Sequence, residues 1–155
     1  QLFRNARSYN GYLDTPVSNA QLDAVWELMK YGPTSANCLP ARLIWCVSQE
    51  SKEKLAALTM PANGEKILNA PVTVIIGMDM AFYEQLPELF PHADARSWFV
   101  GNDAMIQSTA FRNSTLQGAY FMLAARALGL GWIYSFCVAF DRPYAGSRVI
   151  RDLHH

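Results

Sequence analysis

Residues 116–125 read Leu-Gln-Gly-Ala-Tyr-Phe-Met-Leu-Ala-Ala. They form the second half of a helical pattern that runs from about Asp103 to Leu130. The stretch is apolar almost all round, and a helix without a polar face must be buried on every side. Because the chain has only 155 residues, we expect a partner subunit to supply part of that cover. The stretch therefore predicts a long buried helix that also meets a second subunit.

A capping pattern and alternating apolar segments surround this helix. Ser18 and Gln21 have the spacing of a capping box, and apolar residues then recur at helical intervals until Gly32-Pro33 ends the helix. We expect strands at 43–48, 72–78 and 132–138, short helices at 51–58 and 65–69, and an irregular loop with helical turns at 81–98. Helices that alternate with strands predict an α/β or α+β sandwich built on one central sheet.

The composition excludes several classes of protein. The chain is 51% hydrophobic and carries 13 basic and 13 acidic residues, which predicts one folded domain, residues 1–155, with no basic field to hold nucleic acid. The longest strongly apolar run, residues 72–78, is too short to cross a membrane. No secretion leader opens the chain, so we expect a cytoplasmic protein. Cys38, Cys46 and Cys137 lack Cys-x-x-Cys spacing, which favours reduced thiols over a zinc ribbon or disulfides.

Two patterns resemble catalytic motifs but have ordinary explanations. The run Gly129-Leu130-Gly131 begins like a dinucleotide fingerprint, yet it lacks the third glycine and lies between a helix and a strand. We interpret Gly129 as a helix C-cap. Cys38 and His92 could form a thiol nucleophile and its base, as in a thiol hydrolase, although a free cysteine beside an apolar strand is usually packed in a core.

Acidic residues and histidine give no clear metal or acid–base site. His92 and Asp94 offer two metal ligands, whereas a site needs three or four. Glu84 and Glu88 have helical spacing, but the proline between them makes them poor candidates for a catalytic pair. We interpret both as solvated surface carboxylates. The sequence therefore predicts no metal site, and we name no catalytic side chain.

Two polar segments remain as candidates for a ligand site. The first, Arg7-Ser8-Tyr9-Asn10, offers a guanidinium fork, a hydroxyl and an amide, which are donors suited to a phosphate. The second, Pro33-Thr34-Ser35-Ala36-Asn37, offers hydroxyl and amide groups that suit a polar heterocycle edge or a ribityl chain. An ordinary helix surface and a self-capping Pro-Thr-Ser turn would explain the same residues without a ligand.

Several motifs in a fixed order give the chain a family resemblance. Arg7-Ser8, residues 14–18 (Asp-Thr-Pro-Val-Ser) and residues 33–42 (Pro-Thr-Ser-Ala-Asn-Cys-Leu-Pro-Ala-Arg) resemble the nitroreductase family of FMN-dependent oxidoreductases. Residues 90–96 (Phe-Pro-His-Ala-Asp-Ala-Arg) and 111–120 (Phe-Arg-Asn-Ser-Thr-Leu-Gln-Gly-Ala-Tyr) resemble, more narrowly, its malonic semialdehyde reductases of pyrimidine utilisation. The resemblance covers roughly residues 2–130.

This resemblance implies a nitroreductase-like α+β fold. A central mixed sheet would be flanked by helices, and a homodimer would hold two FMN sites at its subunit interface. Arg7 and Ser8 would hold the FMN, and Asn10 stands where many relatives place a second basic residue. The flavin and ribityl chain would be approached, partly from the other subunit, by four residues: Pro33, Thr34, Ser35 and Asn37.

The implied activity is ping-pong hydride transfer through flavin N5. NADPH or NADH would reduce the flavin and be replaced by an acceptor. With malonic semialdehyde as the acceptor, the product would be 3-hydroxypropionate. Two alternatives remain: a broad-specificity nitro or quinone reductase, and a non-catalytic flavin-binding dimer module.

The chain departs from the family pattern after Gly129. From about residue 131 the sequence is atypical or truncated, because only Phe140-Asp141 is retained and Ala139 stands where glycine is expected. Residues 144–155 do not resemble the family's closing strand, and loss of that strand would leave an open sheet edge.

Overall fold

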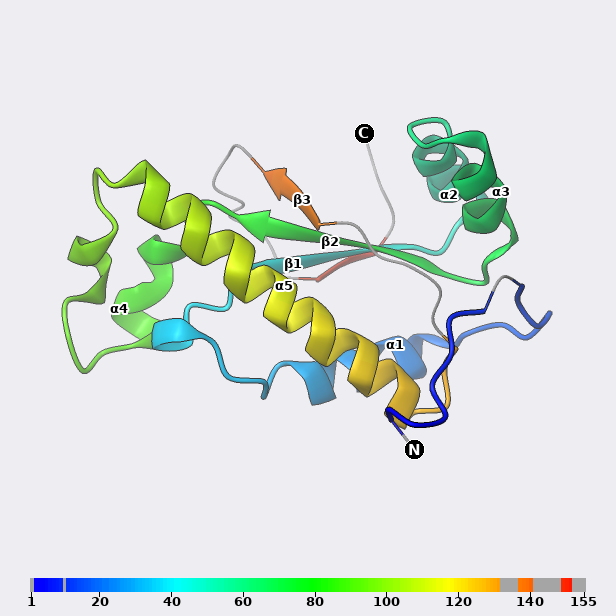
Figure 1. The fold of residues 1–155 in the computed structure, drawn as a ribbon, viewed down its shortest axis with the longest axis horizontal. Coiled ribbons are helices and arrows are strands. Elements are labelled where there is room, and N and C mark those ends of the chain that lie inside the picture. Colours follow the sequence, from blue (N-terminus) through cyan, green and yellow to red (C-terminus); the bar gives the residue numbers. More distant parts are fainter. Residues whose placement is uncertain (1, 10, 132–136, 141–148, 152–155) are drawn as a thin grey trace.

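The computed structural model describes residues 2–9, 11–131, 137–140 and 149–151. A four-stranded sheet with the order β3-β2-β1-β4 lies at its centre (Figure 1). The strands are β1 (Ala41–Cys46), β2 (Thr73–Asp79), β3 (Cys137–Phe140) and β4 (Val149–Arg151). β1 and β2 are antiparallel, whereas β3 runs parallel to β2 and β4 parallel to β1. The predicted central mixed sheet is therefore confirmed.

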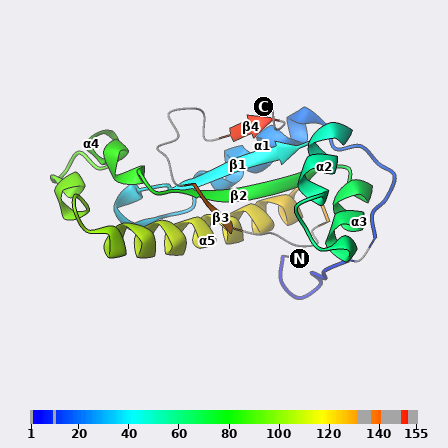
Figure 2. The same ribbon diagram turned by 90° about the horizontal axis from the view of Figure 1, so that it is seen from above.

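Helices lie on one face of this sheet and at both of its ends. They are α1 (Asn19–Met29), α2 (Gln49–Ala56), α3 (Pro61–Asn69), α4 (Leu86–Leu89) and α5 (Asp103–Ala127), with 3-10 turns η1 (Ser35–Asn37), η2 (Phe82–Gln85) and η3 (Ala95–Trp98). α5 crosses one face of the sheet, α2 and α3 pair at one end, and α4 lies at the opposite end (Figures 1 and 2). Among the described residues, no helix is long and apolar enough to span a membrane.

The start of α1 confirms the predicted capping box. The Ser18 hydroxyl accepts a hydrogen bond from the Gln21 amide at 3.3 Å, and the Gln21 side-chain oxygen accepts one from the Ser18 amide at 2.9 Å. Two of the amide groups that a helix start leaves unpaired are satisfied in this way. The cap fixes where α1 begins and therefore where the following loop leaves it.

The main core lies between the sheet, α1 and α5. Alternate residues of β1, Leu43 and Trp45 among them, share one face with Ile76 of β2. The ring of Trp45 packs against that of Phe121 on α5, with centroids 5.4 Å apart. Each large side chain buried in this way contributes about 1.5–3 kcal/mol. This packing fixes α5 across the strands.

α5 is buried on one side only. Its residues facing the sheet and α1 are buried, whereas Phe111 and Leu116 on the outer side are 54% and 40% exposed. The predicted burial on every side is therefore not met within one chain. The outer side carries large apolar side chains that this chain does not cover.

Several element boundaries differ from the sequence prediction. α3 begins at Pro61, earlier than the predicted start at residue 65, because proline is well suited to the first position of a helix. β1 begins at Ala41, two residues before the predicted start. Part of the predicted strand 132–138 lies outside the described residues, and β3 covers residues 137–140.

A short closing strand was not expected from the sequence. β4 pairs in parallel with residues 43–45 of β1, so the structure places a strand on the edge that would have been open. Three residues are too few to show the alternation that marks a strand in a sequence.

Candidate functional site

The loop between α1 and β1 has an unusual backbone. Within residues 33–40, called the 33–40 loop from here on, Ala36, Asn37 and Leu39 have φ angles of 48°, 52° and 41°. Residues with a Cβ atom rarely adopt this left-handed region, and each costs about 1–2 kcal/mol. Such strain persists only where the surroundings impose it, and it is common at functional sites.

Three residues on α5 hold the 33–40 loop in this conformation. Asn113, Gln117 and Tyr120 have the 4- and 3-residue spacing that places side chains on one face of a helix. The Ser35 amide donates to Asn113 Oδ1 and the amide that opens β1 donates to Gln117 Oε1, both at 2.9 Å. The Tyr120 hydroxyl donates to the carbonyl oxygen at the start of the loop, also at 2.9 Å. The central helix thus positions the beginning, middle and end of the loop.

Two polar residues of the 33–40 loop also have structural partners. Thr34 Oγ1 accepts a hydrogen bond from the Leu39 amide at 3.2 Å. Asn37 Nδ2 donates to the Leu89 carbonyl oxygen at 3.0 Å, which ties the loop to α4. The side chains of Pro33, Ser35 and Asn37 are exposed, and Thr34 is partly exposed. The loop is therefore rigidly held while it presents polar groups to solvent.

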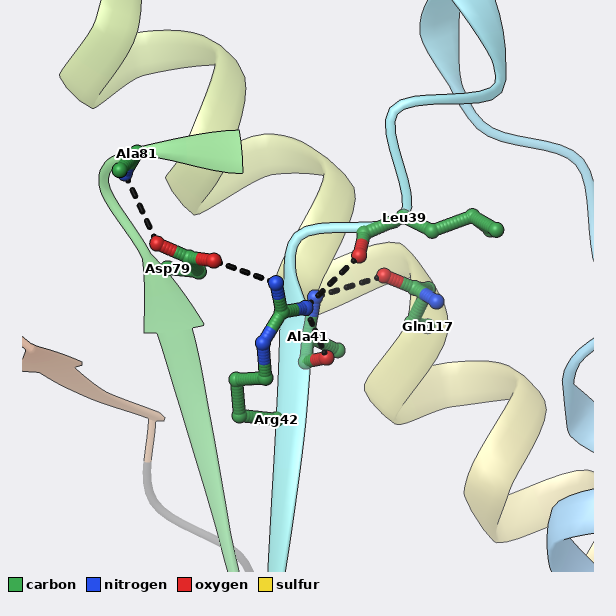
Figure 3. Close-up of polar contacts among 6 residues, drawn as sticks. All are labelled: Leu39, Ala41, Arg42, Asp79, Ala81 and Gln117. Atoms are coloured by element: carbon green, nitrogen blue, oxygen red, sulfur yellow. Dashed lines mark hydrogen bonds and ion pairs between the residues drawn. The ribbon is translucent and has the colours of Figure 1, made fainter. Parts of the chain in front are cut away.

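A buried ion pair lies where this loop enters the sheet (Figure 3). Arg42 Nη2 donates to Asp79 Oδ2, and both side chains are 3% exposed. Arg42 Nη1 also donates to the Leu39 carbonyl oxygen at 3.1 Å. Burial lowers the pKa of Arg42, and the adjacent Asp79 carboxylate opposes this shift.

The N-terminal candidate segment lies at the far end of α5. Arg7 and Ser8 are exposed, and Arg7 Nη1 donates to two nearby backbone carbonyl oxygens at 2.8 and 3.1 Å. Tyr9 lies against Gly131, since a Cβ added there would be 3.9 Å from Tyr9 Cδ2. Asn10 lies outside the described residues. The segment therefore sits close to where α5 ends.

The structure brings Pro33, Thr34, Ser35 and Asn37 together but separates them from Arg7 and Ser8. The 33–40 loop contacts α5 at Asn113, whereas the N-terminal segment lies beyond Ala127, about 20 Å away along the helix axis. Figures 1 and 2 both show the blue N-terminal segment and the cyan loop at opposite ends of the molecule. One chain therefore does not assemble the whole predicted site.

The chemistry of both donor sets nevertheless fits the group that the sequence resemblance implies. An exposed guanidinium with a neighbouring hydroxyl, as at Arg7 and Ser8, suits a phosphate. Exposed amide and hydroxyl groups on a rigid backbone, as at Asn37 and Ser35, suit a ribityl chain and a polar ring edge. FMN contains a phosphate, a ribityl chain and a polar ring edge. It therefore fits these residues if the N-terminal segment and the 33–40 loop come from different chains.

Sequence reasoning missed the residues that support the loop. Asn113, Gln117 and Tyr120 are polar positions on the side of α5 that faces the rest of the chain, and Asn113 and Gln117 are buried. A buried polar side chain needs a hydrogen-bond partner, so this stripe could have indicated a loop packed against it. Arg42 and Asp79 gave a similar signal, because each is a charged residue in a buried strand.

The alternative catalytic motifs acquire structural explanations. Cys38 is buried in a second core cluster with Met78 and Phe82, whereas His92 is exposed and packs edge-on against Phe90. Asp94 caps η3 by accepting from the Ser97 amide at 3.4 Å. Within the described part of the chain, no group of three or more metal-ligating side chains occurs.

Glu84 and Gly129 also have structural partners. Glu84 forms a two-bond ion pair with Arg96, at 2.7 and 2.9 Å, on the surface. Gly129 has a φ of 76°, its amide donates to the Arg126 carbonyl oxygen, and the Leu130 amide donates to that of Ala125. These two bonds form a Schellman motif, which confirms Gly129 as a helix C-cap.

Known proteins share this fold and much of this sequence. A protein of Polynucleobacter asymbioticus, named a candidate NADH dehydrogenase/NAD(P)H nitroreductase, is 59% identical over 130 residues, which are 84% of this chain and 66% of that protein. The chain thus spans about two thirds of the length of this relative.

Two crystal structures have the same fold. A candidate nitroreductase of Bacillus subtilis superposes with a TM-score of 0.74 at 24% identity, covering 83% of this chain and 70% of that one. A candidate nitroreductase of Exiguobacterium sibiricum, solved in complex with FMN, gives a TM-score of 0.69 at 21% identity over 81% and 68% of the two chains.

The match to a family is broader than any of these individual similarities. The family model described as "Nitroreductase family" matches residues 3–154. This range includes the C-terminal part, in which the sequence departs from the family pattern. The nitroreductase-like α+β fold is accordingly confirmed. This chain belongs to the nitroreductase family.

Proposed function

We propose that the protein is an FMN-dependent NAD(P)H oxidoreductase. The observation that carries the proposal is the 33–40 loop, whose three left-handed residues and α5 anchors hold Ser35 and Asn37 exposed. A strained, rigid loop that presents polar groups to solvent is expected of a binding site. The names of the matched relatives and the FMN bound to the Exiguobacterium protein agree with this proposal.

Each candidate residue has a defined task in this proposal. Arg7 and Ser8 bind the phosphate of FMN, and Asn10 is assigned the same task. Pro33, Thr34, Ser35 and Asn37 orient the ribityl chain and the flavin ring and exclude water from one side. When bound, FMN supplies hydride transfer from NADPH or NADH to an acceptor. No side chain of the protein is required as an acid or base.

We further propose that the site forms between two copies of the chain in a homodimer. The exposed Phe111 and Leu116 on the outer side of α5 support this arrangement, because large apolar side chains at an interface are shielded from water. The separation of the two candidate segments along α5 supports it as well. Two-fold pairing of antiparallel α5 helices would bring the loop of one chain to the N-terminal segment of the other.

The acceptor is proposed to be malonic semialdehyde, which would be reduced to 3-hydroxypropionate. This assignment rests on the resemblance of residues 90–96 and 111–120 to malonic semialdehyde reductases. Residues 81–99, called the α4 lobe from here on, include the first of these motifs and are linked to the 33–40 loop by the Asn37–Leu89 hydrogen bond. The names of the relatives favour the alternative of a broad nitro or quinone reductase.

A location in the cytoplasm belongs to the same proposal. Cys38 and Cys46 are buried and form no disulfide, as expected of thiols in a reducing compartment. Neither nucleic acid nor membrane is needed as a partner, since the net charge of the chain is zero.

The first experiment is a visible spectrum of the purified protein with FMN, recorded before and after anaerobic NADPH. Protein-bound flavin whose visible band bleaches with NADPH is the expected result. A folded dimer that binds FMN without oxidising NADPH or NADH would identify the non-catalytic module instead.

The site residues are tested by titrating FMN into matched variants. Arg7→Ala and Asn37→Ala are expected to weaken FMN binding, whereas Arg4→Ala and Asn69→Ala are controls for the same side-chain losses outside the site. Equal FMN affinity in all four variants would show that the assigned residues are wrong.

The acceptor is tested by comparing kcat/KM for malonic semialdehyde with values for nitroaromatics and quinones. We expect the aldehyde to be the best substrate. Turnover of the aldehyde at the background rate, with efficient nitro or quinone reduction, would replace the assignment by the broader one.

A further inference from the structure

The buried Arg42–Asp79 pair joins two segments that border the proposed flavin site. Arg42 is the second residue of β1, two positions after the 33–40 loop, and Asp79 ends β2 two positions before the α4 lobe. Both side chains are 3% exposed. Removing two charges from water is costly, and a buried ion pair is often no more stabilising than apolar residues of the same size. The presence of the pair between these two segments therefore points to a role in positioning.

The contacts of the pair extend to both segments (Figure 3). On one side, Arg42 Nη1 donates to the carbonyl oxygens of Leu39, at 3.1 Å, and Ala41, at 3.0 Å. On the other side, Asp79 Oδ1 accepts from the Ala81 amide at 2.8 Å. Leu39 is one of the left-handed residues, so a charged donor on its carbonyl group stabilises a backbone conformation that is otherwise unfavourable.

We propose that the Arg42–Asp79 pair is a positioning device that holds the 33–40 loop and the α4 lobe in one arrangement. Through the loop, the pair sets how Ser35 and Asn37 face the FMN, and this part rests on the proposed function. The Asn37–Leu89 hydrogen bond is a second link between the same two segments. Arginine is required at position 42 because its planar fork binds a carboxylate and a carbonyl group at once, whereas a lysine ammonium is a single point charge.

The direct test is hydrogen exchange of the full-length chain without added FMN, comparing Arg42→Lys with the unmodified protein. The lysine keeps a positive charge opposite Asp79, which avoids an unpaired buried carboxylate, but it loses the fork to Leu39. We expect exchange of the amides that lie within residues 33–41, at residues 34–39 and 41, to rise about ten-fold, the factor for loss of one hydrogen bond to a charged donor.

Lys52→Met provides the control for loss of charged hydrogen bonds to backbone carbonyl oxygens elsewhere in the chain. Lys52 is 9% exposed, and its Nζ donates to the carbonyl oxygens of Leu68 and Ala70, at 3.4 and 3.1 Å, at the end of α3. We expect this variant to leave exchange of residues 33–41 unchanged. Unchanged loop exchange in Arg42→Lys, or an equal rise in both variants, would overturn the proposal.

A second measurement covers the case in which Arg42→Lys does not fold. In the unmodified protein, the amide of Leu39 lies in the 33–40 loop and that of Ala81 in the α4 lobe, and both segments are held by the Arg42–Asp79 pair. They are expected to exchange through one common opening reaction with the same urea dependence. Two unrelated openings with different urea dependences would show that the loop and the lobe are not coupled.

FMN binding separates this proposal from the proposed function. Arg42→Lys is expected to bind FMN about ten-fold more weakly and to shift the midpoint potential of the bound flavin, while Lys52→Met matches the unmodified protein. Unchanged affinity and potential despite a loosened loop would overturn the flavin part alone. Absence of FMN binding by the unmodified protein would overturn the proposed function, and the exchange experiment would still decide the role of the pair.

Discussion

The ring of Tyr120 occupies the space in which a side chain on residue 32 would lie. A Cβ atom added to Gly32 would be 2.0 Å from Tyr120 Cδ2, far closer than two carbon atoms can approach. The same tyrosine donates its hydroxyl to the Pro33 carbonyl oxygen at 2.9 Å. The end of α1 and the start of the 33–40 loop are therefore fitted to one side chain of α5.

Gly32→Ala should consequently destabilise the protein by about 1–3 kcal/mol, because the tyrosine ring or the backbone must shift. Gly11→Ala is the matched control, since nothing lies within 4 Å of a Cβ atom at residue 11. The free energy of urea unfolding measures both. Equal stability of the two variants would mean that the ring can move aside without cost.

Gln117→Leu should cost about 1–3 kcal/mol, because the buried Ala41 amide would lose its hydrogen-bond acceptor without a change in side-chain size. The same substitution at the exposed Gln107 of α5 is the control and should change stability by less than about 0.5 kcal/mol. Urea unfolding compares them. If both variants lost a similar free energy of unfolding, the cause would be a general effect of leucine in α5 and not the loss of the hydrogen bond to the Ala41 amide.

Gly129→Ala should destabilise the chain by about 1–2 kcal/mol, because the C-cap requires a φ of 76°. Gly129→Asn should lose less, since asparagine tolerates the left-handed region better than alanine does. Thermal unfolding ranks the three proteins. A loss of NADH or NADPH affinity in Gly129→Asn without a loss of stability would instead favour a role in dinucleotide binding.

The Glu84–Arg96 pair should contribute stability that depends on pH. The hydrogen bond from Arg96 lowers the pKa of Glu84 from its ordinary value of 4.5. A lowered carboxyl pKa stabilises the folded state above the unfolded pKa, and this contribution is lost as pH falls through the folded pKa. The stability difference between the unmodified protein and Glu84→Gln should therefore be constant near neutral pH and shrink in acid.

Urea unfolding from pH 7 to about pH 3 measures this difference, and salt should reduce it because the pair is exposed. Glu88→Gln, which removes another exposed carboxylate of the same lobe, is the control. A difference that stays constant into acid would show that the ion pair adds no stability in solution.

Local signals in the sequence predicted the helices and strands whose positions are set by residues close together in the chain. The Ser18–Gln21 capping box located the start of α1, and the richness of residues 72–78 in β-branched side chains located β2 to within one residue at each end. The boundary at Pro61 was misplaced because proline is compatible with both the end of one helix and the start of the next.

The support of the candidate site depends on residues far apart in the chain. Ser35 bonds to a side chain 78 positions away, and Arg42 to one 37 positions away. The left-handed backbone of Ala36 and Asn37 arises from such anchors, since neither residue type imposes it. The candidate residues themselves came from family resemblance, and their roles stay predictions.

The placement of the N-terminal segment and the 33–40 loop at opposite ends of α5 has a consequence for mixtures of defective proteins. If each site takes Arg7 from one chain and Asn37 from the other, an Arg7→Ala/Asn37→Ala mixed dimer contains one site with both residues and one with neither. Random reassociation of the two variants makes half of the dimers mixed, so about one quarter of all sites regain full FMN affinity. Two proteins that each fail alone would then complement one another in a single tube.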